Sequence, residues 1–485
     1  REYLTSLYGT NAALQVAWND PYVTLATATL AIDAERATSD LFLDPQNGHQ
    51  RKVIDSNRFA SVGLAQTLER FAATFKSALG RNVLVSTYYP DIFAGSNGQF
   101  GLEEIEKHCP DIDGVVSVMP YGWWRIPGSA SAYNSVAGSL ALHNKFMLNE
   151  LDYRDPLGWM GGDAWFDNMV SYGGVTTEDA LMSQARRDWG MMFCQGQGGW
   201  YMGIIGPAWT WNSSSTTANL TELLRAADLA AQRPRSDHHG QVAVICDERM
   251  VDCSSYQSMS SNFTFGMALN STAIGLTRQA LSRSGVTWDA YLTSDLGAQA
   301  LLDYKAYVFL SPTGMTQQQI AWVQNNLQKD GRILLWVGPA GISSDGGGFA
   351  SNMQSLTGMS VSYTSSDLRL YRIWPAGSLD TFLREPLRNN AITEMAMPLI
   401  EVTDGNAVTL GLLSDSSNQV GLALRRFTTP AAWTSVVATM PGGLTPELLR
   451  NLVEEVGLTP VGPLNDVTYA GNGFLVIHAT SAGDK

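Results

Sequence analysis

The chain has 485 residues, of which 45% are hydrophobic and only 16% are charged, with 31 Lys and Arg against 45 Asp and Glu. A net charge of −14 without a basic cluster argues against nucleic acid or an anionic membrane surface as a partner. No apolar run reaches the roughly 18 residues that a membrane-spanning helix needs. Four scattered cysteines exclude a disulfide scaffold, and none forms the C-x-x-C pair of a zinc knuckle.

The first 215 residues alternate helical and strand-like patterns. Apolar residues recur at close to helical spacing over 58–79, and Gly80 is a natural stop. Short apolar runs predict buried strands at 82–89, 114–121, 145–150 and 191–194, the last continuing toward 199–204. Continuously apolar strands separated by helices predict a parallel sheet that is covered on both faces.

Polar and aromatic side chains gather where these predicted strands end. The three groups are Tyr88, Tyr89 and Asp91; then Tyr121, Trp123, Trp124 and Arg125; then Asn149, Glu150, Asp152 and Arg154. In a (β/α)8 barrel the carboxyl ends of the strands form the mouth of the active site, although ordinary loop polarity would give similar clusters. Nine of the 14 tryptophans precede residue 212, which slightly favours a sugar site, because a Trp face packs well on a sugar ring.

Glu150 is the strongest catalytic candidate because it closes the strand 145–150, where a buried strand meets the expected mouth. A carboxylate there, near Arg154 and Tyr121, can stay ionised and attack an anomeric carbon. The alternative is a structural glutamate paired with Arg154. Asp152 and Asp155 are competitors that lie further into the loop.

A second alternation follows a predicted linker over 216–240. Strands at 242–246, 286–291, 306–310 and 332–337 are separated by helices at 266–283 and 316–329, a pattern typical of a doubly wound α/β domain. After about residue 395 the strands become shorter, and one helix has Thr445 as N-cap and Pro446 at its first position. The predicted regions are therefore 1–215, 216–240, 241–395 and 396–485.

The second domain carries no recognisable catalytic motif. Its first strand is not followed by a G-x-G-x-x-G fingerprint, its turns lack the Cys of a glutamine amidotransferase, and no G-x-S-x-G elbow occurs. The adjacent His238 and His239 are typical of a solvated loop, and isolated His143 either orients a carboxylate or is structural. The sequence predicts a scaffold here, and no metal or organic cofactor anywhere.

Several segments together resemble the glycoside hydrolase family 42 β-galactosidases and their relatives among retaining (β/α)8 enzymes. Residues 1–18 resemble the segment after strand 4 of that barrel, and strands 5 to 8 are matched by 82–89, 114–121, 145–150 and 189–201. Residues from 241 to about 362 are similar to the family's trimerisation domain, an amidotransferase-like fold without the nucleophile. The resemblance implies the C-terminal part of a TIM barrel, then an amidotransferase-like α/β domain and a smaller strand-rich region, in a homo-oligomer that is a trimer.

The resemblance also implies roles for particular residues. Glu150 matches the nucleophile, Tyr121 the tyrosine that hydrogen-bonds it, and Trp200 the aromatic floor of the sugar site. Further sugar contacts are expected from Tyr88, Trp123, Trp124, Arg154 and Trp159. The expected activity is that of a retaining exo-β-glycosidase, β-galactosidase-like, which removes terminal sugars from oligo- or polysaccharides through a covalent intermediate on Glu150.

Three departures from the family pattern bear on that activity. Met119-Pro-Tyr-Gly stands where the family reads roughly Asp-Ser-Tyr-Pro, and the insertion 152–177 is atypical. The acid/base glutamate of strand 4, which follows an Asn, has no counterpart, so we expect a missing N-terminal part or a second polypeptide that completes the barrel. Asn149-Glu150 also matches that strand-4 pair, but only one more strand fits before residue 215, which favours strand 7.

Two other functional classes remain open at this point. The chain could be a non-catalytic barrel that serves carbohydrate binding or assembly, or, more remotely, an amidotransferase-type enzyme without its usual Cys. A chain that begins at Arg1 and ends soon after a strand-like run is expected to be clipped. Seven lysines and many Ser and Thr residues favour an extracellular protein.

Overall fold

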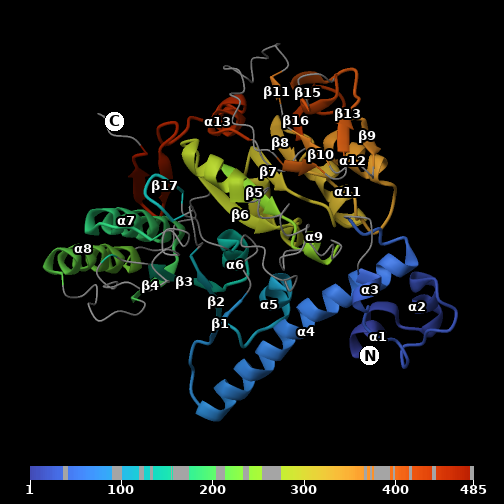
Figure 1. Ribbon diagram of the computed structural model, residues 1–485, viewed down its shortest axis with the longest axis horizontal. Coiled ribbons are helices and arrows are strands. Elements are labelled where there is room, and N and C mark those ends of the chain that lie inside the picture. The colour runs from blue at the N-terminus through green and yellow to red at the C-terminus, as the bar shows by residue number, and fades with distance from the viewer. Residues whose placement is uncertain are drawn as a thin grey trace.

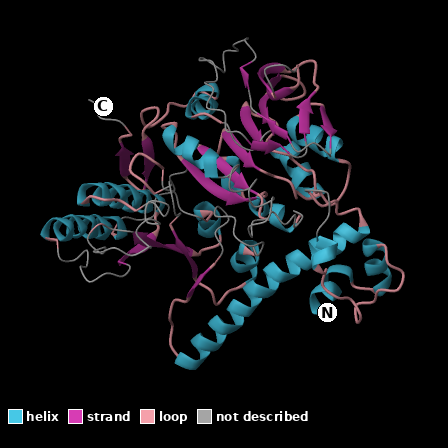
Figure 2. Cartoon of the chain, viewed as in Figure 1, coloured by secondary structure: helices cyan, strands magenta, loops and turns pink. Residues whose placement is uncertain are grey.

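A computed structural model shows a chain built around two sheets (Figure 1). It describes residues 1–36, 42–89, 101–119, 125–130, 135–153, 156, 174–203, 213–232, 240–253, 275–364, 369–371, 374–375, 394–396, 399–413, 418–439 and 444–480. Figure 2 shows helices on both sides of the larger sheet and one long helix running out beyond the smaller one. Within the described ranges, no helix is long and apolar enough to cross a membrane.

The N-terminal part is helical, with α1 (Glu2–Tyr8), α2 (Asn11–Trp18), α3 (Asp33–Arg36) and the long α4 (Gly48–Leu79). Helix α4 begins at Gly48, well before the predicted start at residue 58, because Asn47 caps it. Its first turns bury polar side chains such as Asp55, which accepts a 2.7 Å hydrogen bond from Nε1 of Trp18. Helices α1 and α2 bury polar residues at the start of α4. The helical spacing of apolar residues therefore does not reveal this part of the helix.

The smaller sheet has four parallel strands in the order β1-β2-β3-β4, which confirms the predicted parallel pairing. Its strands are β1 (Ser86–Tyr88), β2 (Gly114–Val118), β3 (Phe146–Tyr153) and β4 (Gly198–Gly203). The helices between and after them are α5 (Leu102–His108), α6 (Ala137–Leu142), α7 (Glu178–Gln195) and α8 (Ser214–Ala231). Within the described chain, β1 and β4 each pair on one side only, and Leu84, in the run that leads into β1, is 75% exposed.

The strand predicted at 191–194 is wrong, since these residues form the last turn of α7. Thr177 caps the start of the helix, and Gly196, at φ 61°, ends it in the left-handed region. The helix packs against α8 and also against the C-terminal hairpin of β17 (Val467–Gly471) and β18 (Phe474–His478). Because α7 is covered on several sides, its last turn is apolar on every face. The hydrophobic pattern there no longer has a helical period.

The larger sheet has eight strands in the order β11-β14-β15-β16-β8-β7-β5-β6. The parallel part comprises β5 (Val242–Cys246), β6 (Trp288–Leu292), β7 (Ala306–Leu310) and β8 (Arg332–Val337), and β16 (Trp433–Ala438) adds to it in parallel. Antiparallel strands extend that edge: β15 (Val420–Phe427), β14 (Val408–Leu412) and β11 (Trp374–Pro375). The sheet therefore contains strands from both sides of the boundary predicted near residue 395. The boundaries between the predicted regions stay predictions.

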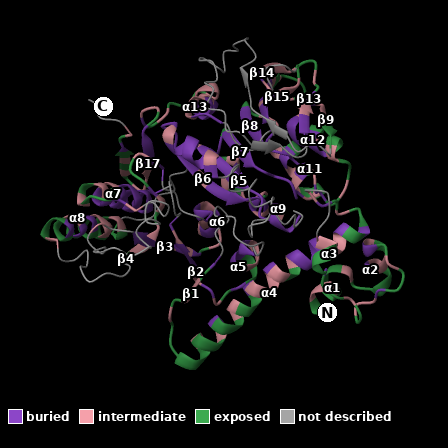
Figure 3. Cartoon of the chain, in the orientation of Figure 1, coloured by how far each residue is buried: buried purple, intermediate pink, exposed green. Residues whose placement is uncertain are grey.

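Helices and short elements cover this sheet, as Figure 3 shows by its largely buried interior. They are α9 (Arg249–Asp252), a helical stretch at 275–283, η3 (Thr293–Asp295), η4 (Gln299–Leu302), α11 (Gln317–Asn326), α12 (Phe349–Thr357) and α13 (Pro446–Glu455). Two small antiparallel pairs complete the described elements: β9 (Val361–Thr364) with β13 (Leu399–Val402), and β10 (Arg369–Tyr371) with β12 (Glu394–Ala396).

Every residue of β5, β7 and β8 is buried, as the doubly wound pattern predicts for that sheet. In the small sheet, where the sequence predicts cover on both faces, Ser86 and Tyr88 of β1 are instead exposed in the described chain. Phe309 and Trp336 stack across β7 and β8 with ring centroids 4.2 Å apart. Thr445 caps α13 as predicted, and Thr316, where the sequence predicts the start of a helix, caps α11. Of the predicted helix 266–283, residues 266–274 lie outside the described residues.

We predict that Gly190→Ala destabilises the protein, because α7 and β18 approach each other at this glycine. A Cβ at Gly190 would lie 2.7 Å from Cγ2 of Val476, whose β-branched side chain has little freedom to move. Overpacking of this kind costs about 1–3 kcal/mol in the free energy of unfolding, which urea denaturation measures.

Gly63→Ala on α4 is the matched control, since a Cβ there meets nothing within 4 Å. This change should be neutral or stabilise the helix by up to about 1 kcal/mol. Val476→Ala should restore most of the stability of Gly190→Ala. Equal stability of the two single glycine variants would show that α7 and β18 do not pack closely in solution.

Candidate active site

Glu150 lies in the middle of the small sheet, and only 8% of it is exposed. On β3 it pairs in register with Val118 of β2 on one side and with Trp200 of β4 on the other. Its backbone oxygen accepts a 3.1 Å hydrogen bond from the amide of Met119. The strand does not end at Glu150, as the sequence suggested, but continues to Tyr153.

Tyr88 is the hydrogen-bond partner of the Glu150 carboxylate: its hydroxyl donates to Oε2. The two residues come from β1 and β3, which flank β2. Burial, together with the hydrogen bond and the charge of Glu150, raises the pKa of Tyr88 to about 12. The phenol therefore remains a proton donor to the carboxylate throughout the ordinary range of pH.

Trp200 completes the group from β4. Its ring meets that of Tyr88 edge to face, with centroids 6.4 Å apart and planes at 87°. Tyr88 is 56% exposed and Trp200 is half-buried, so both rings border the carboxylate from the solvent side. A carboxylate beside a pair of aromatic rings suits a ligand that has apolar C–H faces and a reactive electrophilic carbon.

Buried arginines fix the backbone around this group. Arg125 donates from Nη2 to the carbonyl of Met119 at 2.6 Å and also donates to the carbonyl of Asp152. The carbonyl of Arg125 in turn accepts from Gln184 at 2.6 Å and from Arg187 at 2.9 Å, both on α7. The end of β2, the end of β3 and helix α7 are thereby tied together.

The sequence predicts Arg125 and Asp152 at the mouth, but the structure buries both to 1% exposure. The sequence pattern does not single out the buried Arg187 and Asp188, whose side chains pair at 2.7 Å, or Tyr153, which donates to Asp188 at 2.9 Å. The available signal is the run of three charged residues at 186–188, directly before the apolar residues 189–194.

The structure brings Tyr88, Glu150 and Trp200 together, and the hydrogen bond that it shows to the Glu150 carboxylate comes from Tyr88. The remaining predicted site residues lie outside the described residues: Tyr121, Trp123, Trp124, Arg154 and Trp159. Their roles, and the alternative pairing of Glu150 with Arg154, stay predictions.

Asn149 faces away from Glu150, because successive side chains of a strand point to opposite sides of the sheet. It is 1% exposed, and its Nδ2 donates to Oε1 of Gln197 at 2.7 Å. Asn149 and Glu150 therefore do not present one shared surface to a ligand.

A separate cleft of about 940 Å³ lies among α1, α4, α5 and α9 and does not include Glu150. One arginine of the cleft forms several ion pairs: Arg58 contacts Glu103 at 3.0 Å and the neighbouring Glu248 at 2.8 Å. Burial raises the pKa of Asp252 to about 7, and the charge of Arg58 opposes that shift. This ion-pair network holds α4 against α5 and α9.

Comparisons with known proteins find solved structures with a similar fold. No family model and no curated protein matches the chain. Among solved structures, a cold-adapted β-galactosidase from Rahnella sp. R3 has a TM-score of 0.63 at 10% identity, covering 96% of this chain and 68% of that one. The β-galactosidase from Marinomonas ef1 has a TM-score of 0.58 at 13% identity, covering 96% and 69%.

A catalytic mutant of a glycoside hydrolase family 42 β-galactosidase from G. stearothermophilus has a TM-score of 0.57 at 12% identity, covering 96% of this chain and 67% of that one. The chain thus has a fold like that of the family 42 β-galactosidases, as the sequence resemblance implied. It spans about two thirds of the length of these proteins.

We predict that Glu150→Gln lowers the pKa of Tyr88 toward its ordinary value near 10, because the charge of the acceptor is removed while burial remains. NMR titration of 13Cζ-labelled tyrosine measures the shift, and Tyr88→Phe identifies the signal. In the unchanged protein, the stability contributed by this pair is complete below about pH 10 and is lost as the pH rises toward 12. A Tyr88 signal that titrates identically in Glu150→Gln would contradict the hydrogen bond.

Proposed function

We propose that the protein is a retaining exo-β-glycosidase in which Glu150 is the nucleophile. The observation that carries the proposal is the largely buried Glu150, whose Oε2 accepts a hydrogen bond from Tyr88 and whose strand neighbour Trp200 meets the Tyr88 ring edge to face. Among the described residues, Oε1 of Glu150 has no hydrogen-bond partner, so a lone pair is available for attack. The likeness of the fold to β-galactosidases supports this class of reaction.

The proposed reaction has two displacements at the anomeric carbon. Oε1 of Glu150 attacks that carbon, its bond to the leaving oxygen breaks, and an acid protonates the leaving oxygen. Water then attacks the glycosyl ester, gives its proton to the same group acting as base, and releases the sugar and the Glu150 carboxylate. Tyr88 stabilises the ionised carboxylate before and after the covalent step, and Trp200 provides a wall for the sugar ring.

The acid/base group is proposed to be a Glu outside this sequence, on strands and helices that complete the small sheet into a barrel. In the described part of the chain, β1 and β4 have unpaired edges, and nearby apolar side chains face solvent. The exposed fraction is 69% for Phe71, 53% for Phe75 and 75% for Leu84. Open edges and exposed apolar residues of this kind favour pairing with further chain. A homo-oligomer, a trimer by resemblance, is proposed as well.

Terminal β-galactosides are the proposed substrate class, as the names of the structural neighbours suggest. One observation favours a second function, carbohydrate binding without catalysis. Met119 is 1% exposed and packs in the core, at the position where the resemblance expects an acidic sugar contact. A barrel without that contact could retain the aromatic sugar site and lose turnover.

We predict that Glu150 is labelled covalently by 2-deoxy-2-fluoro β-glycosides with activated leaving groups. Such groups depart without an acid, so trapping does not require the partner glutamate. Intact mass of the full chain should rise by one sugar, and peptide mapping should place the sugar on Glu150. Glu150→Gln should abolish the label.

Asp152→Asn distinguishes the two carboxylates of β3. Loss of the label in Asp152→Asn with retention in Glu150→Gln would overturn the assignment of the nucleophile. Sugar binding by calorimetry, with an unmodified mass for every sugar tested, would favour the non-catalytic function.

We predict that Trp200→Ala slows trapping by about tenfold at low probe concentration, equivalent to about 1.4 kcal/mol of lost contact with the sugar ring. The rate at saturating probe should change less, because Trp200 does not touch the reacting atoms in the proposed mechanism. Trp200→Phe should keep most of the activity. An unchanged rate in Trp200→Ala would remove this residue from the sugar site.

A further inference from the structure

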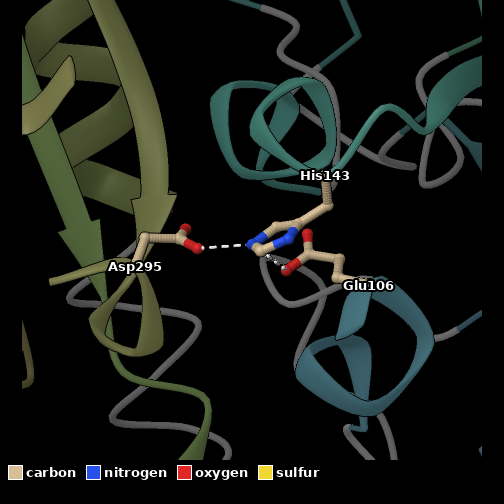
Figure 4. A group of neighbouring side chains, drawn as sticks. All are labelled: Glu106, His143 and Asp295. Atoms are coloured by element: carbon tan, nitrogen blue, oxygen red, sulfur yellow. Dashed lines mark hydrogen bonds and ion pairs between the residues drawn. The ribbon is translucent and has the colours of Figure 1, made fainter. Parts of the chain in front are cut away.

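Three side chains distant in sequence converge between the two sheets, and they do not belong to the site of Glu150. Glu106 lies on α5, His143 follows the end of α6, and Asp295 lies in η3 after β6 (Figure 4). Nε2 of His143 is 2.9 Å from Oδ1 of Asp295 and 4.0 Å from Oε2 of Glu106. One ligand atom from each residue lies within 4.8 Å of the others.

The two carboxylates of this cluster are almost completely buried. The exposed fraction of the side chain is 0% for Glu106 and 1% for Asp295. Within the described chain, no Lys or Arg forms an ion pair with either of them. Burial, followed by the charge of Asp295, raises the pKa of Glu106 well above its usual range. Two carboxylates that are buried side by side, away from water, need a cation or a shared proton.

A second observation points to a ligand. Oε2 of Glu106 accepts a 2.9 Å hydrogen bond from Ser139, but Oε1 is buried and has no partner among the residues that the structure describes. Figure 4 shows the Glu106 carboxylate turned toward the ring of His143. A buried carboxylate oxygen without a partner is costly, and a bound cation would remove that cost.

We propose that Glu106, His143 and Asp295 bind a divalent transition-metal ion, with zinc as the best fit. One imidazole nitrogen and two carboxylates are a donor set typical of zinc. Ligand atoms at about 2.0–2.1 Å in tetrahedral geometry lie about 3.3 Å apart, and the observed separations of 2.9 and 4.0 Å bracket that value. The fourth position is available to the Ser139 hydroxyl or to water.

The surroundings of the cluster meet the other requirements of a metal site. Asp295 is oriented through Oδ2, which accepts from the Leu292 amide at 3.0 Å and from Ser139 at 2.6 Å. The side chain of His143 is 24% exposed, which provides a path of entry. The ion would fasten α5 and α6, beside the small sheet, to η3 of the large sheet. This inference does not rest on the proposed glycosidase function.

The experiment is zinc titration of the chelator-treated, tag-free, full-length chain by isothermal calorimetry, with metal content checked by elemental mass spectrometry. We expect one zinc ion per chain. Outer contacts of a metal site change affinity by 10–100-fold, so loss of a direct ligand in Glu106→Gln or His143→Ala should weaken binding on the order of 100-fold or more. His108→Ala is the matched control, because His108 is exposed on the same helix as Glu106.

Thermal unfolding provides the second readout. Zinc should raise the Tm of the unchanged protein and of His108→Ala but not that of Glu106→Gln, which keeps the shape of the side chain and is expected to fold. Absence of stoichiometric zinc in the unchanged protein would overturn the proposal and indicate a shared proton in its place. Equal zinc affinity in Glu106→Gln, His143→Ala and the control would do the same.

Discussion

The candidate active site depends on the parallel, in-register pairing of β1 to β4. Parallel strands bring their carboxyl ends to one edge, so residues far apart in sequence meet there without any local motif. Glu150 pairs directly with Trp200 through β3 and β4, and Tyr88 reaches the same carboxylate from the other side of β2. A shift of one residue in any pairing would move one of these three side chains to the opposite face of the sheet and separate it from the other two. The buried arginine network between β2, β3 and α7 therefore matters, because it fixes that register at the strand ends.

The two sheets are held together by elements from both ends of the chain. Helix α6 packs on β6 of the large sheet, and the hairpin β17–β18, which follows the large sheet in sequence, packs on α7 beside the small sheet. The C-terminal part of the chain thus adds β14, β15 and β16 to the large sheet and then returns to pack beside the small sheet. The cluster of Glu106, His143 and Asp295 lies at the same junction, where a metal ion would add a third connection.

Much of the fold follows from patterns that are local in sequence. Strands such as β5, β7 and β8 are continuous apolar runs, and α11 and α13 begin at capping threonines, so the sequence predicts them well. The errors occur where a distant segment changes what is buried. Helix α7 loses its helical period because α8 and a hairpin almost 300 residues later cover it, as the contact between Cys194 and Phe474 shows (|i−j| = 280). Helix α4 begins early because α1 and α2 bury its polar first turns.

The site was predicted in part for the same reason. Glu150, Tyr88 and Trp200 each belong to a predicted strand, and the parallel order of these strands brings them close together. The burial of Arg125 and Asp152 could not be predicted, because it depends on α7 closing over the loop. The cluster of Glu106, His143 and Asp295 could not be predicted as a group. The sequence offers His143 as a residue that orients some carboxylate, but His143 and Asp295 are 152 residues apart, and no spacing rule joins them.

Two buried glutamates in this chain are suited to different tasks because their surroundings differ. Glu150 receives a hydrogen bond from Tyr88, a donor that keeps its proton to about pH 12, and the neighbouring rings of Tyr88 and Trp200 are partly exposed. That environment leaves an approach for an electrophilic carbon. Glu106 lies beside the second carboxylate of Asp295 and has one oxygen without a donor, so its ionised form is disfavoured until a cation arrives. In the roles proposed for them, Glu150 acts in covalent chemistry and Glu106 in metal ligation, and burial alone would not tell the two apart.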